Sequence, residues 1–228
     1  REAGRIVAFG MRERTDFTAS NVASRLSDSG FVTEFDLSSP LGRRRIALGL
    51  AGEHNVMNAL AAAAAAHAAG AGIQAIVDGL TSMRAVTGRL EVRSAHAGAR
   101  MIDDSYNANP ASLRAGLRAL TSIPGRHWLV LGEMRELGPA SAQLHAEMGE
   151  FARQTGVARL LAVGDDAHHA VEAFGTGATW FASVDDMIAA LRAELGPDVT
   201  VLVKGSRSNR LERVSAALAT DAASGAGH

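Results

Sequence analysis

The amino-acid sequence predicts an α/β protein whose C-terminal part is a Rossmann-like, mainly parallel sheet with helices on both faces. The first observation is that strand-like and helix-like segments alternate after Gly88. The second is that the preceding stretch has short strands followed by two helices. Strands that alternate with helices of ten or more residues require right-handed crossovers, and these crossovers produce a parallel sheet.

Strand patterns dominate the first 50 residues, where apolar or alternating runs occur at 6–9, 31–35 and 44–48. The next stretch favours helices. Residues 55–69 are rich in alanine and contain no helix breaker, and apolar residues recur at three-and-four spacing over 73–86. The turn Gly70-Ala71-Gly72 separates these two predicted helices.

The second part of the chain repeats a strand followed by a helix. We expect strands at 100–103, 128–131, 160–163, 179–182 and 199–203. We expect helices to begin at Pro110, Pro139, Asp165, Val184 and Ser208. The helical period stops near Thr87, which predicts domains at 1–87 and 88–221, and the small polar residues at 222–228 predict a disordered tail.

Length and composition exclude several classes of protein. The 228 residues, 47% of them hydrophobic, suffice for two small domains. A net charge of -1 offers no basic surface, so we expect no nucleic acid partner. No apolar run approaches the roughly 20 residues of a membrane span, so we expect no membrane insertion. The absence of cysteine excludes disulfides and thiolate sites, and favours the cytoplasm.

The most informative segment is Asp-Asp-Ser-Tyr-Asn-Ala-Asn-Pro at 103–110, between a predicted strand and a predicted helix. Ligands of parallel α/β sheets bind outside the carboxyl ends of the strands, which is where these polar side chains lie. One aspartate can form an N-cap or an Asx turn. Asp104 suits a bidentate grip on ribose hydroxyls, and Tyr106 is placed to lie beside a nucleotide or substrate.

Two further polar segments follow predicted strands. Gly-Glu-Met-Arg-Glu-Leu-Gly at 132–138 is either a solvated turn or a loop of the site, fixed or mobile. In Lys-Gly-Ser-Arg-Ser at 204–208, Lys204 and the free amides of a helix N-terminus predict an anion site for a carboxylate or phosphate. Capping by Ser206 or Ser208 is the alternative, and it does not account for Lys204.

Other candidate residues have both a structural and a functional interpretation. Asn55 can cap the alanine-rich helix, or it can face phosphate while Asn58 binds the edge of an adenine. Arg89 is either a solvated charge or a guanidinium that reaches transferring phosphate oxygens when two domains close. Adjacent His168 and His169 point differently on a helix and lack a carboxylate at metal-ligand spacing, so we expect no metal site there.

The segments at 52–59, 88–90, 103–110, 132–138 and 204–208, in this order and spacing, resemble the Mur ligases over about residues 52–219. The strings at 103–109 and 204–208 resemble the branch that adds D-alanyl-D-alanine. The resemblance implies that residues 1–87 are the C-terminal part of a central ATPase domain, and that 88–221 form the C-terminal ligase domain. One departure is Thr87, where the family usually has proline.

The resemblance also implies an activity. ATP would phosphorylate the terminal carboxylate of UDP-N-acetylmuramoyl-tripeptide, and the amine of D-alanyl-D-alanine would attack the acyl phosphate in peptidoglycan precursor synthesis. The chain contains no Gly-x-x-x-x-Gly-Lys-Ser/Thr phosphate loop and starts at Arg1 rather than methionine. We therefore expect part of a larger monomeric enzyme, inactive alone, whose phosphate loop and Mg²⁺ ligands lie upstream.

The resemblance assigns roles to individual residues. It matches Asn55 and Asn58 to adenine and phosphate contacts, Arg89 to a catalytic phosphate contact, and Asp104 to a ribose ligand. The dipeptide contacts it implies are Asn107, Asn109, Arg135, Lys204, Ser206 and Ser208. Two alternatives stay open: a related amide ligase, such as a folylpolyglutamate synthetase-like or another Mur enzyme, and a non-catalytic nucleotide- or peptide-binding module.

Overall fold

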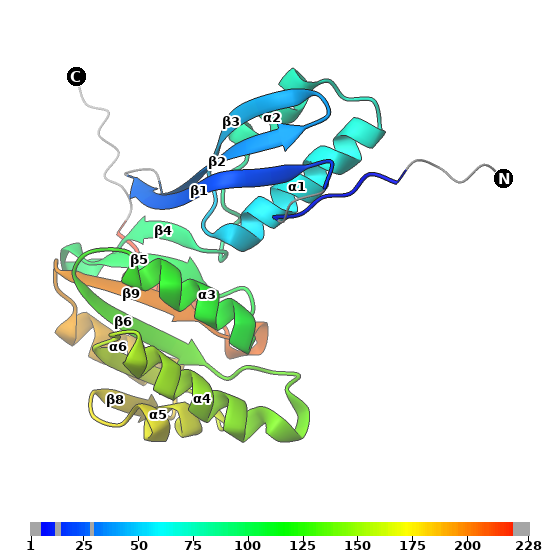
Figure 1. The fold of residues 1–228 in the computed structure, drawn as a ribbon. Coiled ribbons are helices and arrows are strands. Elements are labelled where there is room, and N and C mark those ends of the chain that lie inside the picture. The colour runs from blue at the N-terminus through cyan, green and yellow to red at the C-terminus, as the bar shows by residue number, and fades with distance from the viewer. Residues whose placement is uncertain (1–5, 12–14, 28–29, 221–228) are drawn as a thin grey trace, which may run out of the picture. The chain divides into compact units, whose positions relative to one another are not determined.

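The structure is a computed structural model that describes residues 6–11, 15–27 and 30–220. The chain divides into two compact units, Arg1–Ala85 and Val86–His228 (Figure 1). The tail expected at 222–228 lies outside the described residues, as does residue 221. No helix in the described part of the chain has the length and apolar character needed to cross a membrane.

The N-terminal unit is an antiparallel sheet covered on one face by two helices. The strands β1 (Thr18–Ser27), β2 (Gly30–Ser39) and β3 (Gly42–Leu48) form a meander in that order. The helices are α1 (Glu53–Ala68) and α2 (Ile73–Ser82). Alternate residues of β2 and β3 face these helices, and the core consists mainly of Phe17, Phe35, Leu37, Ile46, Leu48, Val56, Leu60, Ile76 and Leu80.

Two expectations for this unit are wrong in detail, and one strand was missed. Residues 6–9 form no strand, and only Phe9 bridges to Phe17. The strand β1 was not predicted, because its sequence is largely polar and only Ala19 in it is buried, so it has no apolar alternation. The helix α2 ends at Ser82 instead of 86, because Met83 adopts an extended backbone conformation.

The C-terminal unit is built on a six-stranded sheet with the order β4-β5-β9-β6-β7-β8. Only β4 among these strands is antiparallel to its neighbour. The strands are β4 (Glu91–Ser94), β5 (Arg100–Asp104), β6 (Arg126–Gly132), β7 (Arg159–Val163), β8 (Ala178–Phe181) and β9 (Val199–Lys204). This arrangement confirms the predicted mainly parallel sheet.

Helices cover both faces of this sheet (Figure 1). They are α3 (Pro110–Thr121), α4 (Ser141–Gln154), α5 (Ala167–Phe174), α6 (Val184–Glu194) and α7 (Glu212–Leu218). Connections through α3, α4 and α5 step in one direction across the sheet, and α6 returns the chain to β9, so right-handed crossovers put α6 on the opposite face. There α6 and α7 pack on Trp128, Val130, Leu161 and Val201.

Helix starts follow local capping. Asn109 and Ser112 form a capping box before Pro110: Asn109 Oδ1 accepts from Ser112 N at 2.8 Å, and Ser112 Oγ accepts from Asn109 N at 3.1 Å. The helix α7 begins at Glu212 and not at Ser208, because Arg210 adopts a left-handed backbone with φ 53°. Likewise α4 begins at Ser141 and α5 at Ala167, two residues later than expected.

The strand order places the carboxyl ends of β5, β9 and β6 side by side. Lys204 at the end of β9 pairs in register with Asp104 of β5 and with Leu131 of β6. The three polar segments at 103–110, 132–138 and 204–208 therefore meet at one edge of the sheet.

A close contact between α4 and α5 gives a test of this packing. A Cβ added at Gly149 would lie 2.1 Å from the carbonyl oxygen of Ala170. Gly149→Ala should therefore destabilise the C-terminal unit by about 1–3 kcal/mol, despite the higher helix propensity of alanine. The matched control is Gly79→Ala in α2, where no atom lies within 4 Å and about 0.5–1 kcal/mol of stabilisation is expected. Urea denaturation measures both, and equal effects would contradict the packing.

Candidate functional site

A cleft of about 460 Å³ lies at the edge where the three polar segments meet. The residues that line it come from the segments that follow β5, β6 and β9: Tyr106, Asn107, Ala108, Asn109, Arg135, Glu136, Leu137, Ser206, Arg207 and Ser208. Among the residues predicted to bind substrate, the structure brings together Asn107, Asn109, Arg135, Ser206 and Ser208. Two arginines and Glu136 give this cleft both signs of charge.

Lys204 does not line this cleft, because its ammonium group is committed to a buried ion pair. The residue is 2% exposed, and its Nζ donates to Asp104 Oδ2 at 2.5 Å and to the carbonyl oxygen of Asn107 at 2.9 Å. Asp104 Oδ1 accepts from the backbone N–H of Leu90 at 3.2 Å. Both carboxylate oxygens of Asp104 are therefore occupied in this structure, and Lys204 ties β9 to β5.

Burial raises the pKa of the Asp104 carboxyl group, because loss of water disfavours the charged form. The charge of Lys204 and the hydrogen bond it donates act in the opposite direction, and their combined effect is smaller than that of burial. Lys204 therefore offsets only part of the cost of burying the charged form of Asp104.

Hydrogen bonds between two loops fix the segment that follows β6. Ser206 Oγ accepts from the N–H of Arg135 at 2.8 Å, and the N–H of Ser206 donates to the carbonyl oxygen of Glu133 at 3.2 Å. Asn209 Nδ2 bridges the carbonyl oxygens of Glu133 at 2.7 Å and Ser206 at 2.9 Å. Ser206 therefore joins two loops and does not cap a helix with its side chain.

His145 holds the same segment from the side of α4. Its ring is buried, Nε2 accepts from the N–H of Met134 at 2.9 Å, and Nδ1 lies 2.8 Å from the carbonyl oxygen of Ser141. These partners require a neutral ring with the proton on Nδ1. The backbone approaches closely here, since a Cβ on Gly205 would lie 2.9 Å from Gly132 Cα. The walls of the cleft are therefore preorganised.

Sequence reasoning missed His145 and Asn209 as residues that shape the site. His145 lies within a helix, where nothing in the apolar period distinguishes it, and Asn209 follows directly after the 204–208 segment. Arg207, Glu136 and Leu137 stand inside segments that were singled out, but they were not assigned a role. Their position after a strand was the signal that could have identified them.

The side chain of Tyr106 lies between two arginines. The guanidinium carbon of Arg89 is 4.2 Å from the centre of the ring, and that of Arg207 is 5.4 Å away. The N–H of Tyr106 donates to the carbonyl oxygen of Gly88 at 3.0 Å. A smaller hollow of about 230 Å³ adjoins this stack and is lined by Thr87, Gly88, Asp103, Ser105, Tyr106, Arg207 and Glu212. Arg89 is thus held beside the strand ends.

Side chains at the end of β5 also shape their own backbone. Asp103 Oδ1 accepts from the N–H of Ser105 at 3.1 Å, which forms an Asx turn. Asn107 Oδ1 accepts from the N–H of Ala108 at 2.8 Å. Because Asn109 Oδ1 caps α3, the amide oxygens of both asparagines are used internally.

The two asparagines predicted to bind ATP lie at the beginning of α1. Asn55 Nδ2 donates to the carbonyl oxygen of Ala51 at 2.8 Å, and Asn58 Nδ2 donates to Asn55 Oδ1 at 3.4 Å. Asn55 is not an N-cap, which was the structural alternative for this residue, because the helix begins at Glu53 after Gly52, whose φ of 83° suits glycine.

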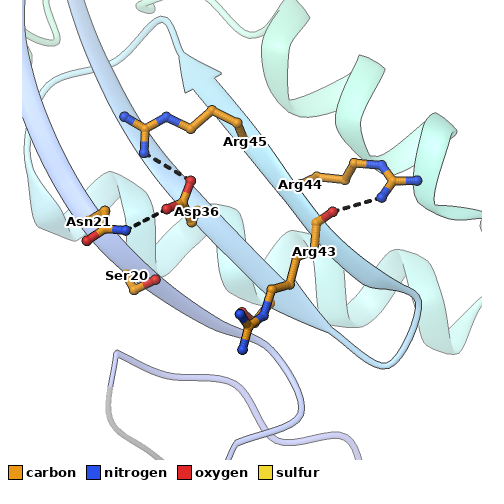
Figure 2. A pocket seen from close by; sticks show the side chains of 7 residues that line it. Ser20, Asn21, Asp36, Arg43, Arg44 and Arg45 are labelled. Atoms are coloured by element: carbon orange, nitrogen blue, oxygen red, sulfur yellow. Dashed lines mark hydrogen bonds and ion pairs between the residues drawn. The ribbon is translucent and has the colours of Figure 1, made fainter.

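A different hollow, of about 290 Å³, lies on the three-stranded sheet (Figure 2). It is lined by Ser20, Asn21, Asp36, Ser38, Arg43, Arg44 and Arg45. Asp36 accepts from Asn21 Nδ2 at 2.7 Å and from Arg45 Nη1 at 3.0 Å, and these bonds lower the pKa of its carboxyl group. Figure 2 shows Arg43 and Arg44 directed away from each other. No residue of the predicted site lies in this hollow.

Two protein-family models match this chain. Residues 88–207 match the model described as the Mur ligase, glutamate ligase domain, and residues 1–66 match the Mur ligase middle domain. The chain belongs to the Mur ligase family.

Comparison with individual Mur ligases shows what share of their length this chain covers. It is 41% identical to UDP-N-acetylmuramoyl-tripeptide--D-alanyl-D-alanine ligase of Escherichia coli, over 90% of this chain and 44% of that protein. The ligase of the same name from Mycobacterium tuberculosis is 38% identical over 82% of this chain and 42% of its own length. The crystal structure of MurF from Acinetobacter baumannii has a TM-score of 0.81 at 33% identity, covering 93% and 46% of the two chains. The chain therefore spans less than half the length of these relatives.

The Asp104–Lys204 pair predicts a pH dependence. The pKa of Asp104 in the folded protein lies above its ordinary value of 3.8, so its contribution to stability is full below that value and is lost as the pH rises through the folded-state pKa. Lys204→Met removes the charge that favours the carboxylate, so it should raise this pKa further and shift the loss of stability to higher pH. A ¹³C NMR titration of the Asp104 carboxyl carbon measures the midpoint.

The control for this titration is Arg153→Met, which removes a positive charge from the exposed end of α4. It should leave the Asp104 midpoint in place. A midpoint that falls in the Lys204→Met variant would show that the ammonium does not stabilise the carboxylate.

Proposed function

We propose that this chain supplies part of the ATP-binding surface and the amine-binding domain of a ligase that joins D-alanyl-D-alanine to UDP-N-acetylmuramoyl-tripeptide. The observation that carries the proposal is the charged cleft at the ends of β5, β6 and β9, in a member of the Mur ligase family. The relatives in E. coli and M. tuberculosis are named for this reaction. The product would be a peptidoglycan precursor.

The composition of the cleft suits a zwitterionic dipeptide. Arg135, Arg207 and the hydroxyl groups of Ser206 and Ser208 can bind a carboxylate through charge-assisted hydrogen bonds. Glu136 brings a negative charge that suits an ammonium group. The volume of the cleft, about 460 Å³, falls in the range of small-molecule sites. In this proposal Lys204 does not contact the dipeptide. It fixes the position of Asp104 and of the Asn107 carbonyl group through its hydrogen bonds.

Four residues would contact the nucleotide. Asn55 and Asn58 offer amide groups to adenine and phosphate, and Asp104 would hold the ribose. Arg89, whose guanidinium lies over the ring of Tyr106, would contact phosphate oxygens as the catalytic arginine. For Asp104 to bind a ribose hydroxyl, its oxygens must accept a further hydrogen bond while Lys204 keeps its own.

The reaction would proceed in two steps. The terminal phosphoryl group of ATP moves to a carboxylate oxygen of the tripeptide, and ADP leaves. The amine nitrogen of the dipeptide then attacks the carbonyl carbon, the C–N bond forms, the bond to phosphate breaks, and the nitrogen loses a proton. Arg89 and the cleft arginines would neutralise and orient the charged oxygens.

Magnesium, when bound, would neutralise the phosphate charges. Mg²⁺ prefers several oxygen ligands, and Glu136 is the single carboxylate among the residues that line the cleft. The cleft residues therefore do not fit as its binding site, and the proposal puts the ligands upstream of this chain. We also propose a cytoplasmic location, which the lack of cysteine favours, and a monomeric enzyme.

Phosphate release tests the proposed reaction. The protein for this assay is this chain joined to an upstream segment that carries the phosphate loop, given ATP, Mg²⁺ and UDP-N-acetylmuramoyl-tripeptide. We expect D-alanyl-D-alanine to stimulate release, and L-alanyl-L-alanine, D-glutamate and L-glutamate to have no effect. Stimulation by a glutamate would favour a related amide ligase. No stimulation by any amine would favour a non-catalytic binding module.

A variant of the same protein tests the assignment of the cleft. Arg135→Ala removes a guanidinium but keeps the backbone N–H that bonds to Ser206. Loss of one charge-assisted hydrogen bond should raise the KM for D-alanyl-D-alanine by about 10- to 100-fold and leave the KM for ATP unchanged. Arg153→Ala, outside the cleft, is the control and should change neither constant. An unchanged KM for the dipeptide in Arg135→Ala would remove Arg135 from the site.

A further inference from the structure

Three potential metal ligands gather on α5, outside the cleft. His168, His169 and Glu172 each offer one ligand atom, and these atoms lie within 4.8 Å of one another. The ring centres of the two histidines are 3.9 Å apart, and His169 Nδ1 lies 3.7 Å from Glu172 Oε2. The expectation that the two rings diverge is therefore wrong, because their 38° tilt keeps them in contact, and Glu172 follows His169 by one helical turn.

A second contact orients one of these rings. His168 Nδ1–H donates a hydrogen bond to the carbonyl oxygen of Asp165. The lone pair of Nε2 in this tautomer can bind a metal ion. Histidines that bind metals commonly donate their other ring N–H to a carbonyl or carboxylate, and this bond fixes both tautomer and orientation. His168 therefore already has the second contact of a metal-binding histidine. Both histidines are partly buried, and Glu172 is exposed.

The local charge also favours a cation. Against binding, the positive end of the α5 helix dipole repels a cation, at a cost of about 0.3–1 kcal/mol at an exposed site. The acidic residues nearby act in the opposite direction. Asp165 and Asp166 directly precede the helix and Glu172 lies within it, so three acidic residues stand in the same short segment as the two histidines. Asp166 Oδ2 accepts a hydrogen bond from the hydroxyl group of Ser141.

We propose that His168, His169 and Glu172 bind a divalent first-row transition metal ion, for which Zn²⁺ is the probe. Two imidazoles and a carboxylate form a ligand set that Zn²⁺ uses, with water completing a tetrahedron. Metal–ligand distances of about 2.0–2.2 Å put tetrahedral ligand atoms about 3.4 Å apart. A rotation of the exposed Glu172 side chain closes the remaining gap. The bound ion would join the first two turns of α5.

Calorimetric titration of the metal-free chain with ZnCl₂ tests this site. We expect one Zn²⁺ per chain, and the ring signals of His168 and His169 should shift together in ¹⁵N NMR spectra. His168→Gln, His169→Gln and Glu172→Gln should each weaken binding by more than about tenfold. Mg²⁺ at the same concentrations should not compete, because it prefers oxygen ligands.

The matched control is His96→Gln, which removes an exposed histidine elsewhere in the same unit. This variant should bind Zn²⁺ as the unchanged chain does, and amide spectra of all four variants should show that each remains folded. Binding that survives the loss of His168 and His169, or that His96→Gln weakens equally, would overturn the proposal. Failure of the chain to bind Zn²⁺ at all would also overturn the proposal. None of these results would bear on the ligase activity.

Discussion

The geometry of the strand-end cleft depends on one buried ammonium group, that of Lys204. It is removed from water almost completely and recovers the lost hydration through Asp104 and the carbonyl oxygen of Asn107. Loss of one partner from such a pair typically costs about 3–5 kcal/mol, because the other charge stays buried. The pair therefore locks the register of β5 against β9 and fixes the start of the segment that forms one wall of the cleft.

The opposite wall is fixed by neutral groups. Ser206, Asn209 and His145 bind the backbone of the segment after β6 from two sides, so Arg135 and Glu136 project from a rigid support. A preorganised site loses less conformational entropy when a ligand binds. At the end of β5, the N–H of Tyr106 is bonded to the carbonyl oxygen of Gly88, and the Tyr106 ring lies against the guanidinium of Arg89.

The sequence was sufficient to predict the parallel sheet and the three polar segments that meet at one edge of it, because apolar alternation and polar residues after strands are local signals. It could not show the pairing of Lys204 with Asp104, since these residues are 100 positions apart and meet only because β9 inserts between β5 and β6. The missed strand β1 lacks apolar alternation, and the late start of α7 depends on the left-handed backbone of Arg210. Both outcomes arise from tertiary context.

The arginine run on β3 has a consequence for the behaviour of the chain in concentrated solution. In the described part of the chain, β3 is paired on one side only and forms an edge of its sheet. An unpaired edge can recruit a strand from another molecule, and natural proteins oppose this with charged side chains. Arg43 and Arg44 place two successive positive charges on that strand, while Arg45 is paired with Glu34 and Asp36 of β2, so a second copy that approaches the edge meets like charge at Arg43 and Arg44. The same residues that line a shallow hollow thus protect the sheet against aggregation.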